Sequence, residues 1–227
     1  MLVVQEIKDL DQTVPYDFLE AINAKSNETY ALVLSERSGQ QEDDQSGQEQ
    51  YASYYRTSRF EATSFWLHND SVNDQFQREP LISNFNLLAD NGSILEEIAL
   101  ITVHTKPASA VNETGALHNV VEIYKQNSTH NHIIVLGDFN ADCGYASTYE
   151  LDQLDIRSSE YTWVVPDSAD TTFSENTHCA YDRIVMTSDV NGRFFDRWGV
   201  DRNMSDSDVS DHYPVWFDLD ISEDVQE

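Results

Sequence analysis

The stretch Leu136-Gly137-Asp138-Phe139-Asn140-Ala141-Asp142-Cys143 continues an apolar run, His132–Leu136, which is typical of a strand buried on both faces. An apolar strand that ends in Asp-x-Asn places two oxygen ligands, from Asp138 and Asn140, at one edge of a sheet. Hard divalent cations such as Mg²⁺ prefer oxygen ligands. The stretch therefore predicts a core strand with a metal-binding end.

A second stretch, Ser210-Asp211-His212-Tyr213-Pro214-Val215, places a carboxylate and a histidine directly before another apolar segment. A histidine exchanges protons near neutral pH, so it can serve as an acid or a base beside a metal site. Together the two stretches predict metal-assisted attack on a phosphate ester.

Three further groups, Glu6, His104 and Asp182, also follow or flank apolar segments. A single aspartate after a strand is usually a turn residue or a helix cap. Strand ends at one edge of a sheet converge in space, however. The set of groups, rather than any one of them, therefore predicts a functional site.

Apolar spacing predicts an α/β fold of packed sheets with helices outside, because strands outnumber helices and at least two helices stand between strands. The predicted loops are Ser38–Gln50 and His68–Arg78, and the strands Tyr51–Tyr55 and Arg59–Trp66 are expected to pair with each other. No repeat or linker divides the chain. The other expected strands are Leu2–Gln5, Tyr30–Leu34, Ile94–His104, His132–Leu136, Tyr161–Val165, Tyr181–Met186 and Tyr213–Leu219, and the expected helices are Pro15–Lys25 and Ser109–Lys125.

The composition is strongly acidic, with 41 acidic and 13 basic residues among 227 and a net charge of −28. Nucleic-acid-binding proteins usually carry the opposite charge. We expect adaptation to high salt, because salt screens the repulsion among the carboxylates, and the alternative is an acidic mesophilic secreted protein. We expect no membrane span, because no run of 18 apolar residues exists, and we see no signal peptide at Met1.

The two cysteines, Cys143 and Cys179, both lie near the ends of predicted core strands. In an intracellular protein such a pair is more often two free thiols. Their placement favours a disulfide, and therefore an oxidising compartment.

Six segments of the chain resemble the deoxyribonuclease I branch of the endonuclease/exonuclease/phosphatase superfamily. Gly-Asp-Phe-Asn and Ser-Asp-His mark the superfamily, and Ala-Asp-Cys and Cys-Ala-Tyr-Asp-Arg-Ile-Val mark the branch. The resemblance implies a four-layer α/β sandwich, in which helices flank two packed mixed β-sheets, over residues 1–220, followed by an acidic tail, 221–227. It also implies a Cys143–Cys179 disulfide. The segments are Val4–Asp9, Gln77–Pro80, Gly137–Cys143, Pro166–Thr172, Cys179–Val185 and Ser210–Val215.

The resemblance also implies catalytic roles. His212 is expected to be the general base, oriented by Asp182, and His104 is expected to act on the acid side, oriented by Glu49. A carboxylate beside a histidine fixes its tautomer and stabilises the imidazolium. The catalytic Mg²⁺ or Mn²⁺ and the scissile phosphate are expected to lie among Glu6, Asp138, Asn140 and Asp211. The implied products carry a 5′-phosphate and a free 3′-hydroxyl.

The resemblance also implies which residues bind the substrate and the structural ions. Arg78, Lys8 and Asn140 are expected to contact DNA, although Arg78 could instead pair with Glu79 or another acid. Two structural Ca²⁺ sites are implied, and the alternative for each is a solvated acidic loop. Their expected ligands are Asp170 and Thr172 in one site, and Asp74, the Phe76 carbonyl and Glu79, with Asp70 as a further candidate, in the other.

The chain departs from the family pattern in three places. The family's first strand, which supplies an active-site asparagine, has no counterpart before Leu2. Lys8 stands where the family has an arginine, and Gly47 stands where a tyrosine packs on the sugar. We therefore expect weaker or altered DNA contact.

These observations predict a secreted, monomeric, divalent-metal-dependent endonuclease that cuts double-stranded DNA. Binding of an actin-like inhibitor is left open. Two alternatives remain at this point. One is a catalytically silent binding protein with the same fold, and the other is a phosphodiesterase of the superfamily that acts on other phosphate esters.

Overall fold

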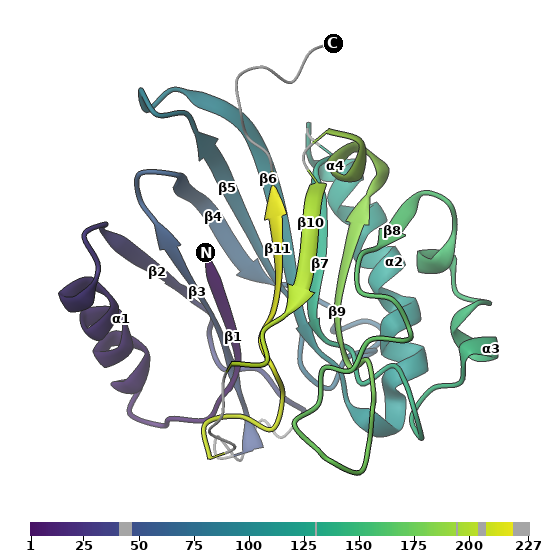
Figure 1. The fold of residues 1–227 in the computed structure, drawn as a ribbon. Coiled ribbons are helices and arrows are strands. Elements are labelled where there is room, and N and C mark those ends of the chain that lie inside the picture. The colour runs from purple at the N-terminus through teal and green to yellow at the C-terminus, as the bar shows by residue number, and fades with distance from the viewer. Residues whose placement is uncertain (41–46, 130, 194, 204–207, 220–227) are drawn as a thin grey trace. The chain divides into compact units, whose positions relative to one another are not determined.

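The computed structural model describes every residue except 41–46, 130, 194, 204–207 and 220–227. The chain divides into two compact units, which we call unit 1 (Met1–His104) and unit 2 (Thr105–Asp220) (Figure 1). The expected acidic tail, 221–227, lies outside the described residues, as does part of the expected loop Ser38–Gln50. Among the described residues, no helix is long and apolar enough to cross a membrane.

Unit 1 contains an antiparallel sheet of strand order β1-β3-β2 and, in a second sheet, the antiparallel strands β4-β5-β6. Neighbouring residues of β3 face opposite ways, as in any strand. Tyr54 meets Phe18 of α1 edge to face, whereas Tyr55 meets Phe85 of β5. One sheet therefore lies between a helix and the other sheet. The elements are β1 (Leu2–Ile7), α1 (Val14–Lys25), β2 (Tyr30–Leu34), β3 (Gln50–Arg56), β4 (Phe60–Leu67), β5 (Leu81–Leu88) and β6 (Ile94–His104).

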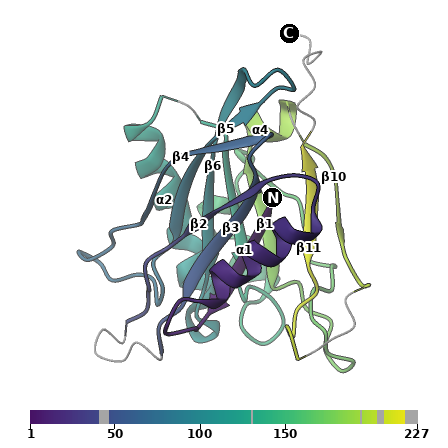
Figure 2. The same ribbon diagram turned by 90° about the vertical axis from the view of Figure 1, so that its left-hand side faces the viewer.

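The position of α1 follows from its sequence. Pro15 lies in the first turn of the helix, where its missing N–H costs nothing, and Lys25 in the last turn complements the helix dipole. The hydroxyl of Tyr54 donates a hydrogen bond to the carbonyl oxygen of Pro15. Figure 2 shows α1 lying across the face of the β1-β3-β2 sheet.

Unit 2 is built on β7, β9 and β8, in the antiparallel order β7-β9-β8. Every residue of β7 is buried, as its unbroken apolar run predicts. Helix α2 packs on β8 through His118, whose Nδ1 lies 2.9 Å from the hydroxyl of Tyr161. A separate pair, β10 and β11, is also antiparallel. The elements are α2 (Ala110–Asn127), β7 (Ile133–Asp138), α3 (Thr148–Leu151), β8 (Tyr161–Trp163), β9 (Asp182–Thr187), α4 (Ser188–Arg193), β10 (Phe195–Val200) and β11 (Val215–Leu219), with short 3-10 turns at Pro107–Ser109 and Asp155–Arg157.

Most of the elements expected from the sequence are present, with two of the strands, Tyr30–Leu34 and Ile94–His104, at the expected bounds. The expected pairing of Tyr51–Tyr55 with Arg59–Trp66 is wrong. Strand β3 is central in its sheet and has β1 and β2 on its two edges, so β4 pairs with β5 in the other sheet. The sequence prediction missed β5, β10 and the short helices α3 and α4.

Candidate functional site

The first group of candidate residues, which we call the His104 cluster, comprises Glu6, Lys8, Glu49, Arg78 and His104 of unit 1. His104 ends β6 and is only 5% exposed. Its Nδ1 lies 2.8 Å from Oε2 of Glu49, which is 2% exposed. This contact orients the imidazole through its Nδ1.

Two cations also contact Glu49. Nε of Arg78 lies 2.8 Å from Oε2, and Nζ of Lys8 lies 3.3 Å from Oε1. Burial alone would raise the pKa of Glu49, but the hydrogen bond and charge of His104 and the charges of Arg78 and Lys8 outweigh it and lower the pKa. Glu49 is therefore an anion at neutral pH. The sequence alternative for Arg78, an ion pair with an acid, is present, and the acid is Glu49.

Glu6 owes its position to an irregularity in β1. The register of β1 with β3 shifts between Val4 and Ile7, and Glu6 has a positive φ of 56°. Such a bulge re-aims a side chain away from the regular alternation of a strand. Oε1 of Glu6 lies 3.4 Å from Nε2 of His104. Each ring nitrogen of His104 therefore faces a carboxylate, Glu49 at Nδ1 and Glu6 at Nε2.

The second group, which we call the His212 cluster, comprises Asp138, Asn140, Asp182, Asp211 and His212 of unit 2. The β7–β9 register pairs Asp138 with Asp182, so the two carboxylates leave the same end of the sheet. The backbone N–H of Asn140 donates to Oδ1 of Asp138 at 2.8 Å. Asn140 adopts a left-handed φ of 49°, which turns the chain sharply after the strand.

Nδ1 of His212 lies 2.7 Å from Oδ2 of Asp182. Burial alone lowers the pKa of His212, but the hydrogen bond and charge of Asp182, together with the charges of Asp138 and Asp211, outweigh it and raise the pKa to about 9. The imidazole is therefore positively charged at neutral pH in the metal-free protein. Each cluster thus contains a histidine whose Nδ1 faces a carboxylate.

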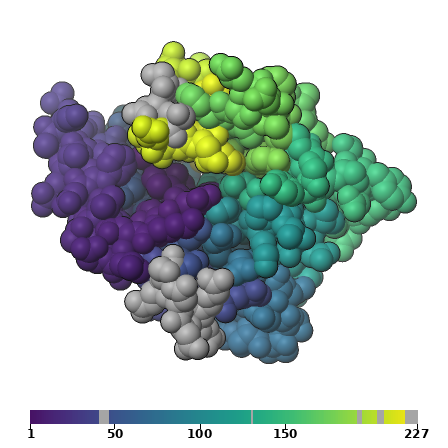
Figure 3. All heavy atoms as spheres, turned by 90° about the horizontal axis from the view of Figure 1, so that it is seen from below, coloured from purple at the N-terminus to yellow at the C-terminus, as the bar shows by residue number. Residues whose placement is uncertain are grey.

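Backbone hydrogen bonds hold His212 beside the segment that follows β8. Phe173 N–H donates to the carbonyl oxygen of Asp211, and Tyr213 N–H donates to that of Thr171. The view from below shows green and yellow parts of unit 2 in contact with each other (Figure 3). The position of His212 therefore depends on the 171–173 segment.

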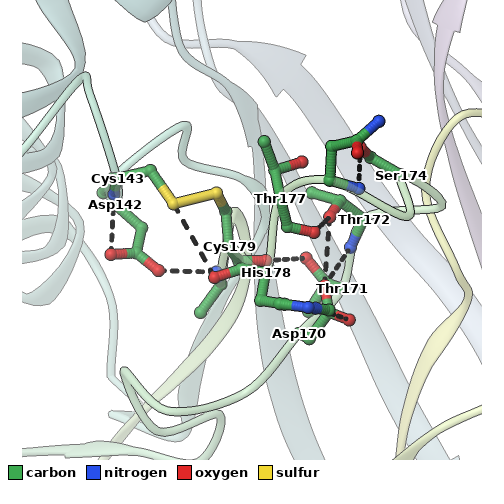
Figure 4. The surroundings of a disulfide bond; sticks show 12 residues. Asp142, Cys143, Asp170, Thr171, Thr172, Ser174, Thr177, His178 and Cys179 are labelled. Atoms are coloured by element: carbon green, nitrogen blue, oxygen red, sulfur yellow. Dashed lines mark hydrogen bonds and ion pairs between the residues drawn. A yellow bond between two sulfur atoms is a disulfide. The ribbon is translucent and has the colours of Figure 1, made fainter.

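Cys143 and Cys179 form a disulfide, as predicted (Figure 4). Asp142, next to Cys143, also contacts the segment of Cys179, because its Oδ2 accepts a hydrogen bond from Ala180 N–H at 2.7 Å. The disulfide thus joins the loop after β7 to the segment that enters β9 at Asp182. It fixes two of the chain segments that carry the His212 cluster.

Two of the expected calcium ligands, Asp170 and Thr172, contact each other, and Asp170 also contacts other side chains. Oδ1 of Asp170 accepts the Thr172 hydroxyl at 3.0 Å. Oδ2 lies 3.1 Å from Nδ1 of His178 and 3.1 Å from Nη2 of Arg202 (His178 is drawn in Figure 4). A guanidinium thus occupies a position from which a cation would bind this carboxylate.

The other expected calcium ligands lie on the loop before β5. Oδ2 of Asp70 accepts a hydrogen bond from Phe76 N–H at 2.9 Å, so Asp70 closes this loop. Oδ1 of Asp74 lies 3.4 Å from Nε2 of Gln40, and Oε2 of Glu79 accepts the hydroxyl of Ser38. The expected ligands therefore share one loop, and the three carboxylates already have protein partners.

The sequence prediction missed three side chains near the His212 cluster. The ring of Tyr181 stacks on His212 with centroids 6.0 Å apart, and Arg202 holds Asp170. Arg183, directly after Asp182, is completely buried. Its place in the Asp-Arg-Ile-Val segment was the only signal available, because spacing alone cannot show that an arginine is buried.

Comparison with known proteins places this geometry in a family context. A sequence model of the Endonuclease/Exonuclease/phosphatase family matches residues 1–212. Deoxyribonuclease-1 of Bos taurus is 32% identical over 231 residues, which cover 95% of this chain and 79% of the relative. Deoxyribonuclease-1-like 1 of Homo sapiens is 30% identical over 234 residues, which cover 98% and 74%.

Solved structures show the same fold at low sequence identity. D. rerio TDP2 complexed with a single-strand DNA product is 14% identical, with a TM-score of 0.63 over 96% of this chain and 84% of that one. The human Nocturnin catalytic domain with a bound sulfate anion is 15% identical, with a TM-score of 0.55 over 96% and 79%. These likenesses confirm the α/β fold class predicted from the sequence.

Proposed function

Because the chain belongs to the endonuclease/exonuclease/phosphatase family and, within it, with the deoxyribonucleases I, we propose that it is a divalent-metal-dependent endonuclease of double-stranded DNA. Its relationship to deoxyribonuclease-1 over nearly its whole length makes it a phosphodiester hydrolase of that kind. The observation that carries the proposal is the presence of two histidine–carboxylate pairs, Glu49–His104 and Asp182–His212.

In this proposal both pairs act on one phosphate. His212 takes the proton of the attacking water, and His104 serves the leaving oxygen. The relationship to deoxyribonuclease-1 over nearly the whole chain supports this arrangement. The products carry a 5′-phosphate and a 3′-hydroxyl.

The charge state of His212 sets a condition on this mechanism. An imidazole with a pKa of about 9 is protonated at neutral pH and cannot accept a proton. Positive charge beside Asp138 and Asp211 lowers that pKa, because their carboxylates help to raise it. We therefore expect the base to become available only when those carboxylates are neutralised.

The chemistry of the donors fits a hard cation. Glu6, Asp138 and Asp211 offer carboxylate oxygens, which suit Mg²⁺ or Mn²⁺, and Asn140 offers an amide oxygen. When bound, such an ion polarises the phosphoryl oxygen and stabilises the charge of the transition state. The protein's own residues orient the phosphate and move the protons.

Arg78 and Lys8 have a double role in this proposal. In the free protein both contact Glu49 and keep it anionic. We propose that both also contact the phosphate backbone of DNA, with Asn140 at the scissile phosphate. An arginine fork suits phosphate, and lysine supplies only a point charge. Cleavage patterns of Lys8→Arg and Gly47→Tyr that matched the wild-type pattern would show that these two positions do not set DNA contact.

Calcium binding is proposed at Asp74, the Phe76 carbonyl and Glu79, which present oxygen atoms on one loop. At Asp170 and Thr172 the fit is poorer, because Arg202 and His178 already contact the Asp170 carboxylate. A calcium ion there would compete with the Arg202 guanidinium.

We further propose that the protein is secreted as a monomer and is adapted to salt. The disulfide suits an oxidising compartment. The net charge of −28 repels DNA at low salt, and this repulsion is screened over about 10 Å at 0.1 M salt. Salt adaptation predicts that cleavage increases with added salt before it declines.

Nicking of supercoiled plasmid with Mg²⁺ or EDTA, across a salt series, tests the proposed function. We expect cleavage with Mg²⁺, none with EDTA and almost none for His212→Gln. His118→Gln is the matched control, because His118 contacts Tyr161 rather than the His212 cluster. Absence of cleavage under all conditions would favour a binding protein, and hydrolysis of small phosphodiesters alone would favour the other enzyme class.

A further inference from the structure

Arg183 is a completely buried charged side chain, one residue after Asp182 in β9. A buried charge is costly unless it is paired and fully hydrogen-bonded. Nη1 of Arg183 lies 2.9 Å from Oδ1 of Asp167 and donates to the carbonyl oxygen of Val165 at 3.0 Å. The residue is therefore anchored on one side by an ion pair and a backbone carbonyl.

The other side of the guanidinium reaches the loop after β7. Nη2 of Arg183 donates to the carbonyl oxygen of Ala141 at 3.1 Å. Ala141 directly follows Asn140, whose left-handed φ of 49° turns the chain sharply at this point and is a conformation in which asparagine is enriched. Asn140 is held on its other side by the bond from its N–H to Asp138. The bond from Arg183 to the Ala141 carbonyl thus fixes the backbone on the other side of Asn140.

A second arginine provides a natural comparison. Nη2 of Arg157 lies 2.7 Å from the same Oδ1 of Asp167, and its guanidinium lies 3.7 Å above the ring of Trp163. The guanidinium of Arg183 lies 5.5 Å from the same ring. Both arginines thus share the anion and the aromatic ring, but the hydrogen bond to Ala141 comes from Arg183.

We propose that Arg183 is a positioning residue for the nuclease reaction, because it holds Asn140 at the phosphate through the Ala141 carbonyl. The inference rests on the proposed function. The contacts of Asp167 with Arg183 and Arg157 stabilise the fold, whereas the Arg183–Ala141 bond acts on the segment that carries Asn140. A small displacement of a group that orients a reacting phosphate reduces the rate by up to about 100-fold.

The test compares Arg183→Lys with Arg157→Lys. A lysine at 183 keeps a charge for Asp167 but has no fork with which to reach Ala141 as well. We expect both variants to unfold at lower temperature than the wild type. Arg183→Lys should lose at least about tenfold in kcat for plasmid cleavage with an almost unchanged KM, because only the orientation of the bound phosphate changes. Arg157→Lys should keep kcat, and equal kcat values in the two variants would overturn the proposal.

A second readout separates this inference from the proposed function. The side-chain amide signals of Asn140 in ¹⁵N-labelled protein should shift in Arg183→Lys and stay in place in Arg157→Lys. Unmoved signals in both variants would refute the positioning role even if the wild type is active. A wild type that cleaves no DNA would instead refute the proposed function, whatever the amide signals show.

Asp167→Asn covers the case in which Arg183→Lys does not fold. It removes the shared charge but leaves the acceptors Val165 and Ala141 for Arg183. We expect a lower melting temperature, with kcat and the Asn140 signals close to those of the wild type. A loss of kcat in this variant would mean that catalysis follows the stability of the whole assembly, which contradicts the role given to the Ala141 bond.

Discussion

Nδ1 of His212 lies 2.7 Å from Oδ2 of Asp182, although the two residues are 30 positions apart in the sequence. The bond fixes the tautomer and orientation of the imidazole and is one of the causes that raise its pKa to about 9. His212 is therefore protonated at neutral pH in the metal-free protein, and in the proposed reaction this proton must leave before His212 can act as the base.

The raised pKa of His212 predicts how stability depends on pH in metal-free buffer. The ordinary pKa is 6.5, so the stabilisation is fully present below about pH 6.5 and is lost as the pH rises through about 9. Its size is on the order of 3 kcal/mol. Urea unfolding in EDTA at pH 6 and pH 9.5 measures it. Asp182→Asn should remove most of this pH dependence, and an unchanged dependence would show that Asp182 does not control His212.

Glu49→Gln tests the other pair. The substitution removes the negative charge that faces His104, Arg78 and Lys8, whereas Lys8 keeps its 3.9 Å contact with Glu6. We expect kcat to fall by about 100- to 10,000-fold, as for the loss of a general acid or base. Glu122→Gln, which breaks the surface pair with Lys125, is the control and should keep kcat. A Glu49→Gln variant as active as this control would remove Glu49 from the mechanism.

The metal requirement should depend on individual carboxylates. Asp138→Asn should raise the Mg²⁺ concentration needed for half-maximal cleavage and lower the maximal rate, because an amide oxygen carries no full charge. Asp142→Asn is a suitable comparison, since Asp142 accepts backbone hydrogen bonds beside the disulfide. Identical Mg²⁺ titrations for the two variants would argue against a metal ligand at Asp138.

Reduction of the Cys143–Cys179 disulfide should lower stability and spare the chemistry at low temperature. The two cysteines are 36 positions apart, and the chain-entropy relation gives about 4 kcal/mol for a loop of this length. The free energy of unfolding of Cys143→Ala/Cys179→Ala, measured in urea, tests this value. A loss below about 1 kcal/mol would mean that the loop is fixed mainly by other contacts, such as the Asp142–Ala180 hydrogen bond.

Replacement of Arg202 should change the response to Ca²⁺. Arg202→Gln frees one side of the Asp170 carboxylate. We therefore expect Ca²⁺ to raise the melting temperature of this variant by more than that of the wild type. An equal Ca²⁺ response in the two proteins would show that Arg202 does not stand in for a cation there.

The sequence predicted the fold best where its apolar pattern was unambiguous. The continuous run at Ile133–Leu136 and the long segment Ile94–His104 are both strands. Strand β5 (Leu81–Leu88) was missed because Asn84 and Asn86 interrupt its apolar run. The β3–β4 pairing was predicted wrongly because the short connection between them resembles a hairpin, whereas the tertiary structure gives each strand other partners.

The site was predictable as a set of residues and much less so as a set of contacts. The motifs pointed to His104, His212 and their carboxylates, and both pairs form. The sequence could not show that Arg78 and Lys8 contact Glu49. Such contacts join segments far apart in the chain and leave no periodic signal.

The central claim is that His104 and His212 act on the same phosphate. A crystal structure with Mg²⁺ and a short DNA duplex tests it most directly. The account predicts one phosphate whose oxygen atoms lie within about 3 Å of Nε2 of both histidines. Imidazoles that face different phosphates, or opposite sides of the protein, would contradict it.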